Sequence, residues 1–135
     1  MATDWHYLDI ADFFVIAETI LGADAKTLAT KHAVDRADSA LHAPQAGFGE
    51  TDIYASLAEK AAVLCSRLAR NHPLPDGNKR VAFISMIEFL DRNDHRWLPH
   101  ENDPESTVEL IESVAANRVE EQEFATIVAS RIAPK

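Results

Sequence analysis

Apolar residues recur at helical spacing along most of the chain. The first such segment covers residues 9–22, and its end is marked by Gly22. Residues 24–43 continue the pattern in a more polar form and predict a second helix. The inner positions of these two segments are Ile10, Phe13, Phe14, Ala17, Ile20 and Leu21 in the first, and Leu28, Ala33, Ala37 and Leu41 in the second.

A break follows at residues 44–52, where one proline and two glycines exclude a helix and predict a loop or a short β-hairpin. Phe48 is its only large apolar residue. Thr51 or Asp52 is placed to cap a third helix over residues 53–71. The apolar stripe of that helix is Leu57, Ala61, Leu64 and Leu68.

Residues 78–94 are apolar almost all round, which predicts the central helix of the domain. Residues 95–104 are expected to form a loop, followed by two closing helices over residues 105–118 and 119–133, the first of them beginning at Pro104. We therefore predict an all-α fold of about six helices in one compact domain, residues 1–135.

Composition narrows the functional classes. The chain has 135 residues, of which 47% are hydrophobic, and its net charge is −9. This charge argues against direct nucleic-acid binding through a broad basic face. Cys65 is the only cysteine, so no internal disulfide can form, and its apolar surroundings predict a buried thiol. The longest apolar stretch, residues 13–17, is too short to span a membrane, and we expect a cytoplasmic protein.

The segment Asn-His-Pro-Leu-Pro-Asp-Gly-Asn-Lys-Arg, residues 71–80, interrupts the helical pattern. Its two prolines end the third helix, and the next helix begins directly afterwards. Gly77, Asn78 and Lys79 would form the first turn of that helix, where backbone N–H groups lack intrahelical acceptors and bind anions. Gly77 would let a ligand approach the backbone. Lys79 and Arg80 add a point charge and a forked cation for phosphate.

Two further side chains in this segment suit phosphate chemistry. Asp76 can cap the helix or hold Mg²⁺, which takes one or two carboxylates together with water and phosphate oxygens. His72 titrates near neutral pH and could remove a proton from an attacking hydroxyl, although a histidine at this position is more often a helix cap. Each residue alone favours a structural role, but their combination favours transfer of a phosphate-containing group from a nucleotide.

The segment from His72 to Arg80 resembles the signature of the Fic/Doc superfamily, with Leu74 where the family usually has phenylalanine. The resemblance is strongest to the Doc branch, extends from about residue 10 to residue 130, and implies a compact helical domain. It implies a general base at His72, a Mg²⁺ ligand at Asp76 and an anion hole at Gly77 and Asn78, the Asn78 side chain helping. Lys79 and Arg80 would contact the phosphates of ATP. Residues 44–52 would be the flap that holds the target beside the site.

Lys79 distinguishes the possible reactions. Fic enzymes that transfer AMP usually have glycine there and a second arginine at the position of Phe83, whereas the Doc branch shares the lysine and is kinase-like. The resemblance thus implies phosphate transfer from ATP to a threonine of elongation factor Tu, which inhibits translation. It also implies a Phd-like antitoxin whose C-terminal segment binds the toxin. AMP transfer, a catalytically weak Doc-like binding module and a plain helical scaffold are the alternatives.

Overall fold

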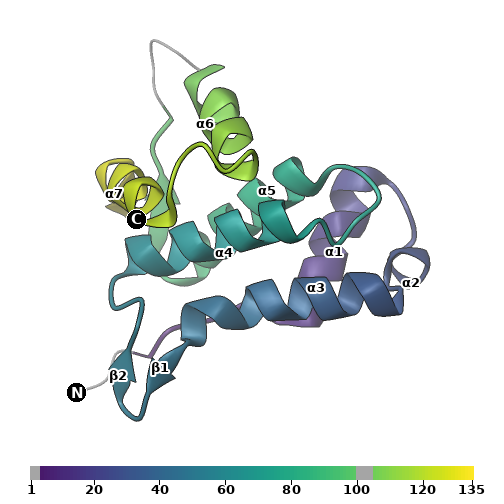
Figure 1. The fold of residues 1–135 in the computed structure, drawn as a ribbon, viewed down its shortest axis with the longest axis horizontal. Helices are drawn as coiled ribbons and strands as arrows, with labels where there is room; N and C mark the ends of the chain where they lie inside the picture. The colour runs from purple at the N-terminus through teal and green to yellow at the C-terminus, as the bar shows by residue number, and fades with distance from the viewer. Residues whose placement is uncertain (1–3, 100–104) are drawn as a thin grey trace.

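The structure is a computed structural model that describes residues 4–99 and 105–135. Seven α-helices make up most of this described part of the chain, with two small antiparallel hairpins (Figure 1). The helices are α1 (Ile10–Leu21), α2 (Ala25–Leu28), α3 (Lys31–His42), α4 (Leu57–Asn71), α5 (Asn78–Arg92), α6 (Glu105–Ala115) and α7 (Glu121–Ser130). A 3-10 turn, η1 (Ala43–Gln45), follows α3. The predicted all-α class is confirmed.

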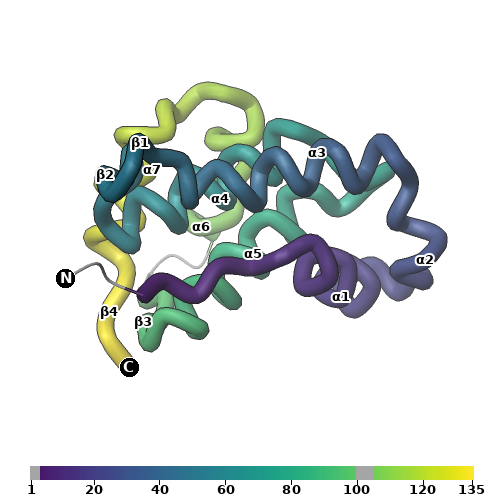
Figure 2. Tube along the Cα trace, turned by 90° about the horizontal axis from the view of Figure 1, so that it is seen from below, coloured from purple at the N-terminus to yellow at the C-terminus, as the bar shows by residue number. Residues whose placement is uncertain are grey.

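The hairpins are β1 (Gly47–Phe48) with β2 (Thr51–Asp52), and β3 (His95–Trp97) with β4 (Ile132–Pro134). The first lies between α3 and α4, as predicted. The second corrects two predictions, because it uses residues expected in a loop and in the end of the last helix. Its two strands are far apart in the sequence but lie side by side, close to the C-terminus in space (Figure 2). Residues 100–104, with the expected helix start at Pro104, lie outside the described residues.

The predicted helix over residues 24–43 is divided in two. Asp24 caps α2, and the chain leaves the helix at Ala29. The Thr30 hydroxyl then accepts a hydrogen bond of 3.1 Å from the Ala33 N–H and starts α3. A side-chain oxygen that can bond nearby backbone competes with helix continuation, so the threonine acts as a new cap. The inner positions expected in this region are buried nevertheless.

The start of α4 is also later than predicted. Thr51 and Asp52 lie in β2, and the cap is Ser56. The Ser56 hydroxyl accepts from the Glu59 N–H at 3.1 Å, while the Glu59 carboxylate accepts from the Ser56 N–H. This reciprocal pair is a capping box, so four further residues remain outside the helix.

The central helix is α4, and the prediction that residues 78–94 would occupy this place was wrong. Eleven of the 15 residues of α4 are buried, compared with seven of the 15 in α5. The predicted stripe of α4 is confirmed, and it packs between α3, α5 and α7 (Figure 1). Cys65 is fully buried in it, and burial raises the pKa of its thiol to about 12. No helix in the described part of the chain combines the length and apolarity needed to cross a membrane.

A buried lysine attaches the first hairpin to α4. The Lys60 side chain has no exposed area, and its ammonium donates to the Pro44 carbonyl at 2.9 Å and to the Asp52 carboxylate at 3.1 Å. The rings of Trp5 and Tyr7 cover the same ammonium at 5.6 and 5.5 Å. These contacts satisfy a charge that would otherwise be costly to bury, and they join three segments of chain.

Replacing Lys60 with methionine should lower the free energy of unfolding by about 1–3 kcal/mol, because the buried Pro44 carbonyl loses its donor. Asp52 contributes little to this loss, since 41% of its side chain is exposed to water. Urea unfolding measures the change. Lys31→Met is the matched control, because Lys31 forms an ion pair that is exposed on both sides, and we expect no measurable change. Equal effects in the two variants would contradict the assignment.

A second ion pair joins α1 to α5. Arg92 donates to both oxygens of Asp12 at 2.9 and 3.1 Å, and this bond is the main cause that lowers the pKa of Asp12 below its ordinary value of 3.8. A carboxylate with a lowered folded-state pKa stabilises the fold above its unfolded pKa and loses that contribution as the pH falls through the folded value.

Arg92→Met should therefore raise the pKa of Asp12 towards 3.8 and weaken the dependence of stability on pH just below that value. NMR titration of the Asp12 carboxyl and urea unfolding above and below pH 3.8 measure both effects. Arg96→Met, at an exposed position of β3, is the control. An unchanged Asp12 titration would show that Arg92 does not set this pKa.

Candidate active site

The predicted site lies in the short connection between α4 and α5. The helix α4 ends at His72, whose backbone is left-handed, with φ 49° and ψ 56°. Pro73 and Leu74 are buried behind it, whereas Pro75 and Asp76 are exposed. Leu74, with 4% of its area exposed, anchors the loop in the core. It does so although it is smaller than the phenylalanine that is usual at this position in the family that the sequence resembles. The predicted break is therefore a short loop that its buried residues anchor to the core.

The His72 ring is oriented by the helix that it ends. Its Nδ1 lies 3.1 Å from the Ala69 carbonyl oxygen. A carbonyl can only accept, so Nδ1 carries the hydrogen and the neutral ring has its lone pair on Nε2. The imidazole is exposed, and its remaining nitrogen is in the chemical form of a proton acceptor. His72 can therefore have both of the roles considered from the sequence. It ends the helix as a cap, and its second ring nitrogen keeps a lone pair that can accept a proton.

Asn78 holds the loop together through its side chain. Its Oδ1 accepts from the Leu74 N–H, and its Nδ2 donates to the Leu74 carbonyl, both at 2.9 Å. The residue is buried, with 9% of its area exposed. Its amide group is thus engaged with the backbone of Leu74, which identifies a structural role for a side chain that was expected to help bind an anion.

Gly77 has a structural role in addition to the one expected from the sequence. Its φ of 74° is in the left-handed region, and an added Cβ would lie too close to the Leu21 side chain at the end of α1. A larger residue would therefore strain the backbone and push the Leu21 side chain aside. The absent side chain makes room for the protein's own packing on this flank, and no ligand approach is needed to explain the glycine.

The first turn of α5 is left open to an anion. Gly77 is its N-cap and provides no side-chain acceptor. Among the described residues, no acceptor contacts the N–H groups of Asn78, Lys79 and Arg80. The Lys79 and Arg80 side chains are exposed and form no ion pair within the described part of the chain. Two cations at a helix N-terminus oppose the helix dipole, so the turn is electrostatically prepared for a negative ligand.

All six predicted site residues line one open cleft of about 520 Å³. The loop and α5 form one side of it, and the other is formed by Glu112 and Ala115 at the end of α6 and by Ala116 directly after it. Sequence reasoning did not identify these residues, because only the packing of α6 beside α5 brings them to the loop. The full lining is His72, Leu74, Pro75, Asp76, Gly77, Asn78, Lys79, Arg80, Glu112, Ala115 and Ala116.

The hairpin expected to be the flap is present, but its residues do not line the cleft. Figure 1 shows the β1–β2 hairpin at one end of α4 and the α4–α5 loop at the other, and the 15 residues of α4 correspond to about 22 Å. The hairpin is therefore separated from the loop by the length of α4, and its role as a flap stays a prediction. The segment that flanks the loop is that of α2 and the start of α3. Thr27, Leu28, Thr30 and His32 face residues 73–75 across a hollow of about 180 Å³.

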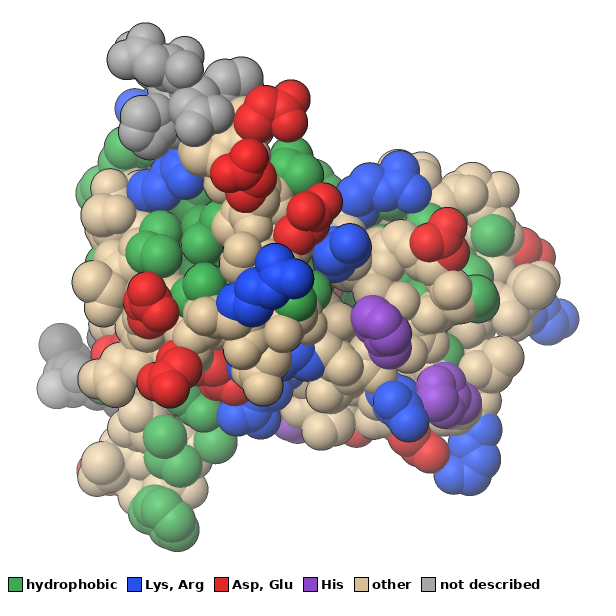
Figure 3. Space-filling model, turned by 45° about the horizontal axis from the view of Figure 1, so that its top comes forward, with side chains coloured by type: hydrophobic (Ala, Val, Ile, Leu, Met, Phe, Trp, Pro, Cys, Tyr) green, Lys and Arg blue, Asp and Glu red, His purple; other side chains and the backbone are tan. Residues whose placement is uncertain are grey.

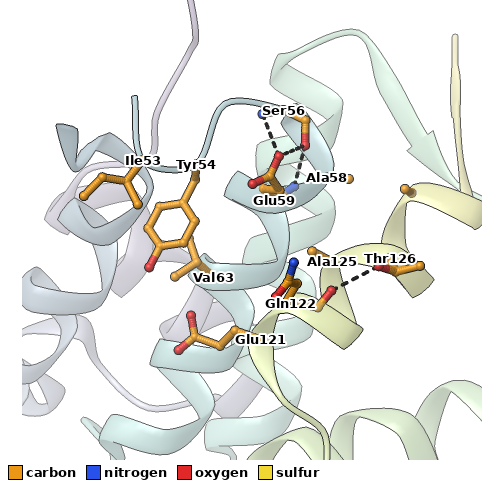
Figure 4. Close-up of a pocket in the computed structure, with 11 residues that line it drawn as sticks. Ile53, Tyr54, Ser56, Ala58, Glu59, Val63, Glu121, Gln122, Ala125 and Thr126 are labelled. Carbon is orange, nitrogen blue, oxygen red and sulfur yellow. Dashed lines mark hydrogen bonds between the residues drawn. The ribbon is translucent and has the colours of Figure 1, made fainter. Parts of the chain in front are cut away.

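A larger groove of about 590 Å³ lies between the start of α4 and α7, and it contains none of the predicted site residues. Figure 4 shows Tyr54 and Glu121 on two of its walls. Arg67 donates to the Glu121 carboxylate at 2.7 Å and lies 3.4 Å from the Tyr54 hydroxyl, so these polar groups are paired within the protein. Size alone does not make this groove the reactive one.

Charge is mixed on the face drawn in Figure 3, where Lys and Arg side chains alternate with Asp, Glu and hydrophobic ones and histidines are exposed. This face therefore presents no continuous basic surface of the kind that nucleic-acid backbones bind. The cations beside the cleft are local, which suits a small phosphate-bearing ligand better than a polymer.

Comparison with known proteins identifies a family whose matching region includes the loop between α4 and α5. Residues 7–90, which contain α1 to α5 up to Leu90, match the family described as "Fic/DOC family", and the chain belongs to this family. A relative named "Toxin Doc", from Mycolicibacterium smegmatis, is 38% identical over 87 residues, which is 64% of this chain and 64% of the relative. The match thus spans less than two thirds of that protein. No solved structure matches the chain.

Proposed function

We propose that this protein is a Doc-like toxin that transfers a phosphate group from ATP to a hydroxyl of a target protein. The proposed target is a threonine of elongation factor Tu, so that translation stops. The observation that carries the proposal is the pairing of His72 with the open first turn of α5. A nitrogen base and a row of free N–H groups line the same cleft. Family membership and the relative named as a toxin support the biological role.

The proposed chemistry assigns one task to each side chain. His72 Nε2 accepts the proton of the target hydroxyl as its oxygen attacks the γ-phosphorus of ATP. The bond from that phosphorus to the oxygen bridging the β-phosphate breaks, and ADP leaves with the electron pair. The Ala69 carbonyl keeps the ring in the required tautomer. The N–H groups of α5 and the Lys79 and Arg80 cations stabilise the negative charge on the phosphate oxygens. Asn78 keeps the loop in shape for this task through its bonds to Leu74.

The residues present fit a magnesium-bound nucleotide. Asp76 is exposed at the cleft and forms no ion pair within the described residues, so its carboxylate is available. Within residues 4–99 and 105–135 there is no group of three or more potential metal ligands, and Mg²⁺ normally needs only one or two carboxylates beside phosphate oxygens. Asp76 would hold the ion, which would neutralise phosphate charge.

AMP transfer is the second candidate, because the same cleft could bind the α-phosphate instead. Lys79 favours phosphate transfer, since this lysine lines the cleft at the position where AMP-transferring Fic enzymes usually have glycine. A catalytically weak binding module would keep the fold without the reaction. As partner we propose a Phd-like antitoxin whose C-terminal segment binds the toxin, in line with the relative's name.

Intact mass spectrometry separates these functions. The protein is incubated with elongation factor Tu, Mg²⁺ and ATP labelled at the α- or the γ-phosphate. A gain of one phosphate, with transfer of the γ-label, is the expected result. A gain of one AMP with the α-label would establish the second candidate, and no gain would contradict the proposed target. His72→Asn is the negative control, because asparagine tolerates the left-handed backbone but supplies no base.

A further inference from the structure

A second, apolar cavity lies beside the cleft. This cavity measures about 200 Å³ and lies between α5 and α6. Its walls include Phe83, Val108 and Ile111. It shares Lys79, Arg80 and Glu112 with the cleft, so the two hollows are adjacent. A polar end with cations and an apolar end with an aromatic ring suit a ligand that has phosphates at one end and a flat ring at the other.

Glu112 occupies the junction of the two cavities. It is the only residue of α6 with a charged side chain that lines both of them. Its carboxylate forms no ion pair within the described residues, and the residue is exposed. A free carboxylate beside two phosphate-binding cations would weaken anion binding unless it serves a different part of the ligand. Between the phosphates and the base of a nucleotide lies the sugar.

We propose that Glu112 accepts hydrogen bonds from the sugar hydroxyls of the bound nucleotide and so selects ribonucleotides over deoxyribonucleotides. A carboxylate has acceptor sites for both hydroxyls, and acidic side chains bind ribose in this way in dinucleotide-binding folds. The inference rests on the proposed use of a nucleotide by the cleft, and it assigns a residue that the loop motif does not contain.

A missing hydroxyl should be costly at such a site. When the ligand lacks it, the exposed carboxylate bonds water in place of the sugar, and the charge-assisted bond to the ligand is lost. Loss of one charge-assisted bond corresponds to about tenfold in affinity or more. The apolar walls contribute equally to both sugars, so they do not enter the ratio.

The test compares the binding of Mg²⁺–ATP with that of its 2′-deoxy and 3′-deoxy analogues by calorimetry. The unaltered protein should bind ATP about tenfold more tightly than at least one analogue. Glu112→Ala should reduce this ratio to near one, and Glu112→Gln, which keeps one acceptor oxygen, should retain part of it. Because removal of a negative charge strengthens binding of every nucleotide alike, the ratio, and not the affinity itself, is the diagnostic quantity.

Glu109→Gln is the matched control, since this glutamate is exposed on the same helix but lines neither cavity. It should keep the ratio of the unaltered protein. Inorganic tripolyphosphate should bind more weakly than ATP. Equal binding of ATP and both analogues by the unaltered protein, or a ratio that survives Glu112→Ala, would overturn the role of Glu112 and leave the proposed function intact. Failure to bind any nucleotide would overturn both.

Discussion

Replacing His72 with alanine is expected to reduce the rate of group transfer by about 10²–10⁴-fold, the usual contribution of a positioned general base. The physical reason is the single free ring nitrogen. Nδ1 is bonded to the Ala69 carbonyl at 3.1 Å, which leaves Nε2 as the proton acceptor at the cleft. The rate is measured by transfer of labelled phosphate, and growth arrest on expression gives the corresponding cellular result.

The fold should survive this change, because the imidazole is exposed and buries little apolar surface. Alanine is mildly strained at a φ of 49°, so His72→Asn serves as the second variant, with a residue that accepts this backbone more readily. Both variants should unfold at nearly the same urea concentration as the unaltered protein. The control is His42→Ala, at an exposed histidine of α3 outside the cleft. Transfer at the normal rate by either His72 variant would refute the base assignment.

Replacing Asn78 with alanine is expected to have the largest effect on stability, about 2–4 kcal/mol, and to remove nucleotide binding. The change leaves both the N–H and the carbonyl of Leu74 without partners, in a residue with only 4% exposure. Each unsatisfied buried group costs about 1–3 kcal/mol. Urea unfolding and calorimetric titration with Mg²⁺–ATP measure the two effects.

Asn78→Asp separates the two bonds. An aspartate keeps an acceptor for the Leu74 N–H but places a carboxylate oxygen against the Leu74 carbonyl, so it should restore only part of the lost stability. It also adds negative charge beside the proposed phosphate position, and nucleotide affinity should stay low even where the fold recovers. Full nucleotide binding by Asn78→Ala would show that the bonds to Leu74 are not what shapes the loop.

Local patterns predicted the parts of this protein that depend on neighbours in the sequence. The periodicity of α1 and α4 identified their buried faces, and the ten-residue segment around His72 placed the site on one loop, because residues so close in the chain share one cleft. The helix boundaries at Thr30 and Ser56 were missed although both residues have capping chemistry. In each case the surrounding sequence also fits a longer helix. The hydrogen bonds of the cap decide where the helix begins.

Features that depend on distant contacts could not be predicted in this way. The pairing of β3 with β4 joins segments separated by all of α6 and α7, and each strand has only three residues, too few for a periodic pattern to identify it. Glu112 is one of several acids on α6, and only the packing of that helix distinguishes it. Composition predicted the hairpin and the family resemblance placed it beside the site, whereas the structure has it at the other end of α4.

Cys65 has a practical consequence for experiments with this protein. It is the only cysteine in the chain, it has no exposed area, and its pKa of about 12 keeps the sulfur as an unreactive thiol at neutral pH. A cysteine could be introduced at the exposed hairpin position Phe48, which is 80% exposed to solvent. It would then be the one cysteine that reacts with a maleimide dye. Single-fluorophore measurements of partner association are thus accessible without first removing the native sulfur.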